Sequence, residues 1–204
     1  MLATRSAGKL RELRPIFESY GVPVIDLAEA GVPETPDEES IESYETFEEN
    51  ALAKARYFFA RCGGLAVVAD DSGLVVDALG GEPGVRSKRW SGRSDLDGAA
   101  LDQANNQKLL SRLHGVRERR ARFICAAAWR GADGELTTRG EVEGRIVERA
   151  SGTHGFGYDP FFFADELGMT LADATAEAKR SVSHRGRAFD ALARRLRAQG
   201  LLTG

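Results

Sequence analysis

The spacing of apolar residues along the chain predicts four helices. After Ser6, which is in position to cap a helix, apolar residues recur at 3,4,3 spacing and would share one face: Leu10, Leu13, Phe17 and Tyr20. Thr46 and Glu49 have the spacing of a capping box, so a second helix is expected from there to the glycine pair at 63 and 64. A third is expected over Asp95–Leu113, and a fourth follows Ser183 with an inner face of Ala188, Leu192 and Leu196.

Short apolar runs between these helices predict strands. Residues 1–4 and 65–69 are two such runs, and residues 74–79 form a further strand or continue the second one after a turn at Asp70–Gly73. Residues 121–129 and 136–147 predict an antiparallel hairpin whose turn is RGADG. Strands therefore alternate with helices before a hairpin follows, so the expected fold is α/β, with a mixed central sheet flanked by helices.

The composition is that of a globular protein. Of 204 residues, 42% are hydrophobic, which is enough for one large domain or for two small lobes that share the sheet. The net charge of -3 argues against a protein that binds nucleic acid by bulk charge, so an anionic partner must be met by a local site. Cys62 and Cys125 fit neither a disulfide framework nor a zinc site. No signal region and no membrane-spanning run is present, so we expect a cytoplasmic protein without a membrane partner.

Two adjacent carboxylates, Asp70 and Asp71, directly follow an apolar run. A carboxylate that points into a core must be hydrated, paired or bound to a metal, so this charge requires compensation. Glu42 and Lys54 are read either as surface residues or as part of the same site. Mg²⁺ prefers one or two carboxylates together with water and substrate phosphate, so Glu42 and Asp71 would hold it if the fold brings them together.

Three further stretches contain residue types suited to a polar or aromatic ligand. ATRSAGK, at 3–9, offers hydroxyls, a lysine and the N–H groups of a helix start to an anion, or is a simple cap. SGTHGFGYDPFF, at 151–162, combines glycines that allow close approach with an aromatic stacking face, or is a tight loop. AEAKRSVSHRG, at 176–186, brings three basic side chains to the last helix as donors for a polar ligand edge, or is solvent-facing.

In order and spacing, five segments resemble one family, the inosine triphosphate pyrophosphatases, also described as non-canonical purine nucleoside triphosphate pyrophosphatases. They are ATRSAGKLREL, residues 42–60, ADDSGLVVDALGGEPGVRSKRWSG, GFGYDPFF and AKRSVSHRGRA, which together span nearly the full chain. The resemblance implies one catalytic domain over residues 1–204, two lobes with an active-site cleft between them, and a homodimer. It also implies Mg²⁺-dependent hydrolysis of inosine, deoxyinosine and xanthosine triphosphates (ITP, dITP and XTP) to the monophosphate and pyrophosphate, which would remove deaminated purines from the nucleotide pool.

The resemblance further implies roles for individual residues. Asp71 would be the catalytic proton acceptor and, with Glu42, a metal ligand. The triphosphate would be bound by Lys54, Ser72 and the segment Thr4, Arg5, Ser6, Ala7, Gly8 and Lys9. Phe156 would stack on the base, and Gly157, Tyr158 and Asp159 would complete that wall. The edge of the base would be recognised by Lys179, His184 and Arg185.

Two positions depart from the family pattern. Thr4, Arg5 and Ser6 stand where Thr-Gly-Asn is common, and Arg180 stands where an asparagine commonly follows the lysine. Ser6 can donate one hydrogen bond but lacks the reach of an amide. Arg5 would then support the triphosphate in place of that amide, or would be a solvated arginine.

Other functions are compatible with parts of the chain. A pyrimidine-directed nucleotide pyrophosphatase would share the chemistry and differ in its base pocket. The nucleophile motif DxDx[TV] of haloacid-dehalogenase-type phosphatases does not match ADDSG. A nucleotide-binding or single-strand RNA-binding module would use Phe156 as a stacking platform without catalysis. We expect a small nucleotide substrate and no stable nucleic-acid partner.

Overall fold

The computed structural model describes residues 1–202, which fold as two compact units. Unit 1 contains Met1–Asp71, Cys125–Gly140 and the chain from His184 onward, and unit 2 contains Ser72–Ile124 and Glu141–Ser183. The chain passes from one unit to the other within three strands, so both units use parts of the same sheet.

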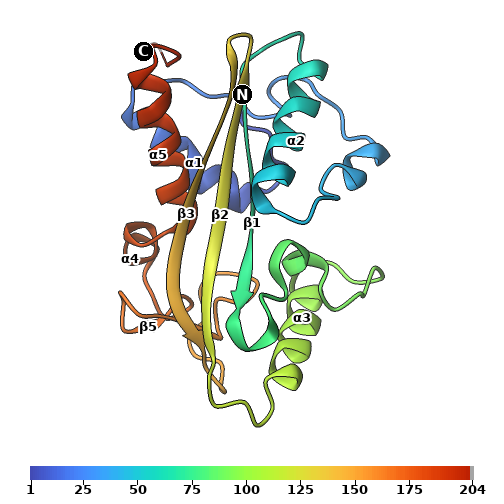
Figure 1. Cartoon of the computed structure of the whole chain (residues 1–204), viewed down its shortest axis with the longest axis vertical. Helices are drawn as coiled ribbons and strands as arrows, with labels where there is room; N and C mark the ends of the chain where they lie inside the picture. Colours follow the sequence, from blue (N-terminus) through green and yellow to red (C-terminus); the bar gives the residue numbers. More distant parts are fainter. Residues whose placement is uncertain (203–204) are drawn as a thin grey trace. The chain divides into compact units, whose positions relative to one another are not determined.

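Five strands form the sheet in the order β1-β2-β3-β4-β5 (Figure 1). They are β1 Val67–Val76, β2 Arg120–Gly131, β3 Gly134–Ile146, β4 Phe162–Ala164 and β5 Met169–Thr170. Strand β4 pairs antiparallel with both β3 and β5, whereas Leu2 forms parallel bridges with Asp26 and Val68. The predicted α/β class is therefore confirmed, with the parallel pairing confined to the isolated bridges of Leu2 outside the five named strands.

The expected turn at Asp70–Gly73 is wrong, because β1 continues through these residues without interruption. Nine of its ten residues are buried, including both aspartates. Asp and Ser favour turns because their side chains bond to the nearby backbone, and Gly does so because it adopts positive φ without steric cost. Here Lys9 and Arg185 pair with the Asp70 carboxylate and Asn50 donates a hydrogen bond to Asp71, so the segment can remain a buried strand at the end of the sheet.

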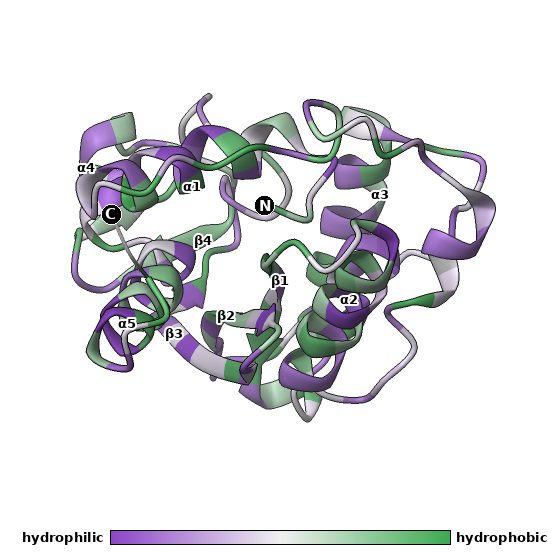
Figure 2. Cartoon of the chain, turned by 90° about the horizontal axis from the view of Figure 1, so that it is seen from above, coloured by the Kyte–Doolittle hydropathy of each residue, from purple (hydrophilic) through white to green (hydrophobic). Residues whose placement is uncertain are grey.

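Unit 1 is built on four helical segments: α1 Ala7–Ser19, the 3-10 helix Pro36–Ser40, α2 Phe47–Arg61 and α5 His184–Ala198. The caps predicted at Ser6 and Thr46 are present, since each side chain accepts a hydrogen bond from a backbone N–H three residues later. Helices α1 and α5 lie side by side and share a core with β1 and β2 (Figure 1). Both α2 and α5 carry polar and apolar residues (Figure 2), as amphipathic helices that cover a sheet require.

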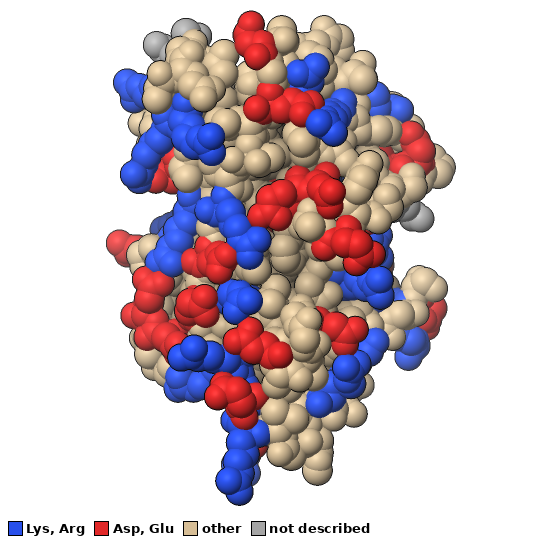
Figure 3. Space-filling model, viewed as in Figure 1, with Lys and Arg blue, Asp and Glu red and all other residues tan. Residues whose placement is uncertain are grey.

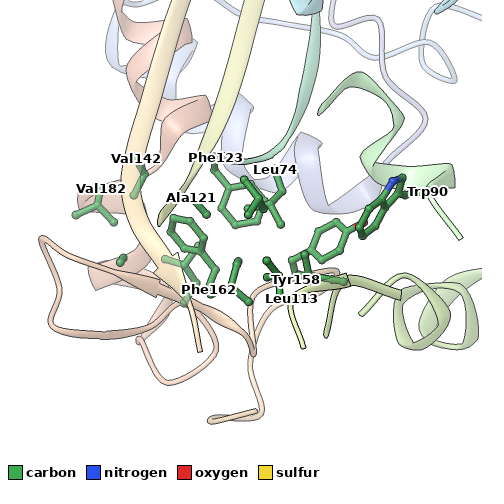
Figure 4. Packing of buried hydrophobic residues seen from close by; sticks show 14 residues of the cluster. Leu74, Trp90, Leu113, Ala121, Phe123, Val142, Tyr158, Phe162 and Val182 are labelled. Atoms are coloured by element: carbon green, nitrogen blue, oxygen red, sulfur yellow. The ribbon is translucent and has the colours of Figure 1, made fainter. Parts of the chain in front are cut away.

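Unit 2 contains the 3-10 helices Asp77–Leu79 and Gly84–Arg89, with α3 Gly98–Arg112 and the short α4 Ala176–Ser181. Helix α3 begins three residues later than predicted: Asp97, at the N-cap position, is still extended, and Asp95 is ion-paired with Arg93. The core of unit 2 joins residues of β1, β2 and β3 to Trp90, Tyr158 and Phe162 (Figure 4). Phe162 packs against Phe123 with ring centroids 4.7 Å apart. Tyr158, which lies in the 155–159 loop, is a member of this core and therefore ties the loop to it.

Acidic and basic side chains are interspersed over the face drawn in Figure 3, without a large region of one sign. This distribution agrees with the small net charge of -3. Both cysteines are free thiols, as predicted. Among residues 1–202, no helix has the length and apolar character needed to cross a membrane.

Candidate active site

Asp70 and Asp71 occupy consecutive positions of β1 and are 1% and 7% exposed. Successive side chains of a strand point to opposite faces, so the two carboxylates enter different environments. Asp70 contacts residues of α1 and α5, whereas Asp71 contacts α2. The pair is therefore two separate sites of negative charge rather than one.

Asp70 lies within a cluster of cations. Its Oδ2 atom is 2.9 Å from Lys9 Nζ and 3.3 Å from Arg185 Nε, and its backbone oxygen accepts a hydrogen bond from Lys54 Nζ at 2.9 Å. Burial alone would raise the pKa of Asp70, but the charges of Lys9, Arg185 and Lys54 outweigh burial and hold the pKa well below its usual value. Asp70 is thus an ionised carboxylate whose negative charge is balanced by these three cationic side chains.

Asp71 has the opposite balance. Burial, followed by the negative charge of Glu42, raises the pKa of Asp71 to about 6. Its Oδ2 atom accepts a 3.0 Å hydrogen bond from Asn50 Nδ2. A carboxylate with a raised pKa is a better proton acceptor than an ordinary aspartate, so of the two aspartates Asp71 has the properties of a general base.

Asn50 connects Asp71 to the segment that carries Glu42. Besides its bond to Asp71, the buried Asn50 amide donates to the backbone oxygen of Tyr44 and accepts from the backbone N–H of Tyr44, at 3.2 and 2.9 Å. Glu42 itself forms a close ion pair with Lys54, and that charge lowers the pKa of Glu42 against the effect of burial. Glu42, Lys54 and Asp71 are therefore brought together, as predicted.

The N-terminal segment places its residues at the start of α1. Ala7 and Gly8 are the first residues of the helix, whose initial N–H groups have no partner inside the helix. Ser6 accepts a hydrogen bond from Lys9 N, and Thr4 Oγ1 accepts one from Ser6 N at 3.2 Å. The start of α1 thus carries both unpartnered backbone N–H groups and Lys9, whose ammonium group is ion-paired with Asp70.

Arg5 lies apart from this cluster. Its guanidinium donates to Glu38, to the backbone oxygen of Val32 at 2.9 Å and to that of Pro33 at 3.0 Å. The guanidinium therefore holds the 32–38 segment, and its side chain stays 30% exposed. Phosphate binding by Arg5 remains a prediction, in which the guanidinium would exchange some of these four donor contacts for phosphate oxygens.

His184 and Arg185 begin α5, where Gly140 of β3 allows the helix to approach. A Cβ atom at Gly140 would lie 2.2 Å from the backbone oxygen of His184, so only glycine fits. Arg185 is 4% exposed, and its Nη1 atom is 2.6 Å from Glu12 Oε2. Because its guanidinium pairs with Asp70 and Glu12, Arg185 does not offer that group to a base as we expected, whereas the half-buried His184 stays a predicted base contact.

In unit 2, the 155–159 loop forms a pre-shaped aromatic platform. Phe156 is 54% exposed, and Lys179 Nζ lies 5.0 Å from the centroid of its ring. The buried Asp159 accepts from Phe156 N at 2.9 Å and from Lys179 Nζ at 2.7 Å. Tyr158 points into the core and donates its hydroxyl to Ser87 O at 2.8 Å, so Tyr158 anchors the loop rather than facing a ligand.

Gly155 is needed for this arrangement. It has a φ of +81°, and a Cβ atom there would lie 2.1 Å from Asp159 Oδ2.

Ser72, on the unit 2 part of β1, is half-buried. The predicted residues thus form two groups: those around Asp70 and Asp71 in unit 1, and Ser72, the 155–159 loop and Lys179 in unit 2.

Two residues of the unit 1 group escaped the sequence analysis, although a spacing signal existed for each. Asn50 precedes Lys54 by four residues, and Glu12 follows Lys9 by three, so each shares a helix face with a lysine of the site. Within residues 1–202, no group of three or more His, Cys, Asp or Glu side chains is arranged to hold a metal ion.

Comparison with known proteins supports a single assignment. A model of the Ham1 family matches residues 1–195. A dITP/XTP pyrophosphatase of Geobacter sulfurreducens is 48% identical over 98% of each chain, and one of Frankia alni is 48% identical over 97% of this chain and 96% of its own.

Solved structures agree with the sequence matches. The Ham1 protein of Staphylococcus aureus superposes with a TM-score of 0.83 at 36% identity, over 97% of each chain. A nucleoside-triphosphatase / dITP/XTP pyrophosphatase of Mycobacterium abscessus has a TM-score of 0.75 at 43% identity, over 96% of this chain and 97% of its own. The family resemblance inferred from the five sequence segments is confirmed, and the chain belongs to the Ham1 family.

Proposed function

We propose that this chain hydrolyses dITP, XTP and ITP to the nucleoside monophosphate and pyrophosphate with the help of Mg²⁺. Its relatives over nearly the full chain are named dITP/XTP pyrophosphatases, so the chain is a nucleoside triphosphate pyrophosphatase. The observation that carries the proposal is the arrangement around β1: the Asp71 carboxylate is buried and held by Asn50, and the adjacent Asp70 is bound by Lys9 and Lys54, the second of which pairs with Glu42. The biological role would be removal of deaminated purine nucleotides from the nucleotide pool.

The donor set fits a magnesium ion. Mg²⁺ is usually held by one or two carboxylates, with water and substrate phosphates supplying the other ligands. Glu42 and Asp71 lie near enough for the charge of Glu42 to raise the pKa of Asp71, so both would hold the ion, Glu42 in exchange for its ion pair with Lys54. A bound divalent cation would offset the negative charge of the phosphates and polarise a phosphoryl oxygen.

The chain's own residues would position and deprotonate the attacking water. Asp71 accepts the proton of a water aimed at the α-phosphorus, and Lys9, Lys54, Ser72 and the N–H groups at the start of α1 hold the phosphates. Attack at the α-phosphorus makes pyrophosphate the leaving group. The negative charge that develops on the phosphates is met by these lysines, whose ammonium groups remain anchored at Asp70.

We assign the base to the platform in unit 2. Phe156 would stack on it, and Lys179, His184 and backbone N–H groups would donate hydrogen bonds to a 6-oxo group. Adenine presents a 6-amino donor there, which would leave buried donors unpaired, and sites of this kind discriminate by about 10⁴-fold. Stacking alone would not discriminate, since every base has a π-face.

A substrate panel tests the proposal. Purified protein with Mg²⁺ is incubated with ITP, dITP, XTP, ATP, GTP and CTP, and pyrophosphate is resolved from orthophosphate. We expect pyrophosphate from the first three. Orthophosphate as the primary product, or equal kcat/KM on ATP and ITP, would refute it, and a preference for CTP would favour the pyrimidine-directed alternative.

Replacing the proposed base tests the assignment of Asp71. Asp71→Asn should lower kcat by about 10²- to 10⁴-fold, the range typical of general-base loss, while circular dichroism stays unchanged. Asp133→Asn, in the exposed turn between β2 and β3, is the matched control and should retain full activity. The absence of turnover at any Mg²⁺ concentration in wild-type protein would favour a binding module instead. The homodimer and the cytoplasmic location stay predictions, the first of which sedimentation can test.

A further inference from the structure

Helix α3 holds both backbone groups of Gly157, the residue that follows Phe156 in the loop. Asp102 Oδ2 accepts a hydrogen bond from Gly157 N at 2.8 Å, and Asn106 Nδ2 donates to Gly157 O at 2.8 Å. The two residues are four positions apart and therefore share one face of the helix. They lie about 50 residues before the loop in sequence, at separations of 55 and 51, so no local pattern connects them to it.

These contacts complete the fixation of the platform. Phe156 N is already held by Asp159, and Tyr158 is anchored at Ser87 O. Gly157 has a φ of +62°, and without contacts to its N–H and C=O a glycine in a loop retains more conformational freedom than any other residue. The two side chains of α3 therefore determine where the exposed Phe156 ring is presented.

These contacts fix the position of the loop at a cost in stability. Asn106 is buried, yet within residues 1–202 its Oδ1 atom has no hydrogen-bond partner, so the residue bears the cost of an unpaired buried acceptor to place its Nδ2 donor at Gly157. A leucine would fill the same volume without that cost. The cost of burying Asn106 is explained if ligand binding requires the loop to be held in this position.

We propose that Asp102 and Asn106 are positioning residues for the base of the nucleotide, acting through the Gly157 peptide and Phe156. This inference rests on the proposed function, in which Phe156 receives the base. Neither residue touches the substrate. Their removal should weaken binding of the base and leave binding of the phosphates unchanged.

The test separates base binding from phosphate binding. KM and kcat for dITP are measured together with the inhibition constant of inorganic tripolyphosphate, which has no base, in Asp102→Ala, Asn106→Ala, Asp102→Asn and wild-type protein. We expect Asp102→Ala to raise the KM for dITP about tenfold, as the loss of a hydrogen bond to a charged group implies. The tripolyphosphate constant and kcat should stay within about twofold, and Asp102→Asn, which keeps an acceptor oxygen, should recover most of the KM.

Controls exclude a purely structural effect. Gln103→Ala, an exposed residue on the same helix, should leave every constant unchanged. Amide hydrogen exchange at Gly157 reads the anchor directly and should accelerate in Asp102→Ala. Unchanged exchange, an unchanged KM for dITP, or a parallel rise of KM and the tripolyphosphate constant would each overturn the inference.

Failure of the proposed function gives a different result. If wild-type protein does not hydrolyse dITP, or if Phe156→Ala leaves its KM unchanged, the proposed function or its base platform is wrong. The anchoring by α3 is then still decided by the Gly157 exchange rates. The two failures are therefore distinguishable.

Discussion

The buried charge cluster in unit 1 predicts that Arg185→Met destabilises the protein instead of relaxing its base selectivity. Arg185 is 4% exposed and pairs with Asp70, which is 1% exposed, and with Glu12 at 2.6 Å. Removing one partner of a buried ion pair typically costs about 3–5 kcal/mol, because it leaves an uncompensated charge. Lys9 and Lys54 would remain near Asp70, so we expect about 3 kcal/mol, the lower end of that range.

Two comparisons refine this magnitude. The Lys9 side chain is 21% exposed, so water can replace it more easily, and Lys9→Met should destabilise by about 1 kcal/mol. Arg197→Met, at an exposed position of α5, should change the free energy of unfolding by less than about 0.5 kcal/mol. The predicted loss of stability thus decreases from Arg185→Met to Lys9→Met to Arg197→Met, in the same order as the burial of the three side chains.

The assay is urea unfolding of Arg185→Met, Asp70→Asn and the double variant, which together form a double-mutant cycle. A direct pair should give a coupling energy of about 1.5 kcal/mol or more, within the range found for interacting residues. The ratio of kcat/KM for dITP to that for dATP is measured in parallel and should not change. Stability within about 0.5 kcal/mol of wild type, combined with a fall in that ratio, would refute the reasoning and restore Arg185 as a base contact.

Three further predictions address other parts of the structure. Gly155→Ala should destabilise the protein by about 1–3 kcal/mol in thermal unfolding, because φ is +81° and the new Cβ would meet Asp159 Oδ2. Gly157→Ala is the control for the cost of a positive φ alone, since no atom of residues 1–202 lies within 4 Å of the Cβ added there. Asn50→Asp should destabilise more than Asn50→Ala in urea unfolding, since it replaces the donor that faces Asp71 Oδ2 and Tyr44 O by a carboxylate; equal values would mean that the Asn50 amide does not have the assigned orientation. A hydrogen bond from the Glu29 N–H, together with Arg14, lowers the pKa of Asp26 against burial, so the stabilisation from this carboxylate is present above its unfolded value of 3.8 and is lost as pH falls through the lower folded pKa. The difference in melting temperature between wild type and Asp26→Asn should therefore shrink from pH 7 to pH 3, whereas a constant difference would contradict the shift; the exposed Asp165→Asn serves as the control.

The sequence by itself determined the features that depend on neighbouring residues. The start of α1 at Ser6, the start of α2 at Thr46 and the inner face of α5 were predictable, because caps and helical spacing involve residues within one or two turns. The hairpin of β2 and β3 was predictable for the same reason, since its two strands are joined by a short turn. The five motif segments likewise carried the family assignment without any knowledge of the fold.

The tertiary structure decided what happens to the charges. Asp70 and Arg185 are 115 residues apart, and Asp71 meets Asn50 across 21 residues, so no local rule reveals these pairs. Without them, Asp70–Gly73 has the composition of a turn, and Arg185 has that of a ligand donor. A buried strand and a structural arginine result because a charge in a low-dielectric interior is stable only beside its partner, and the partners are selected by how distant segments pack.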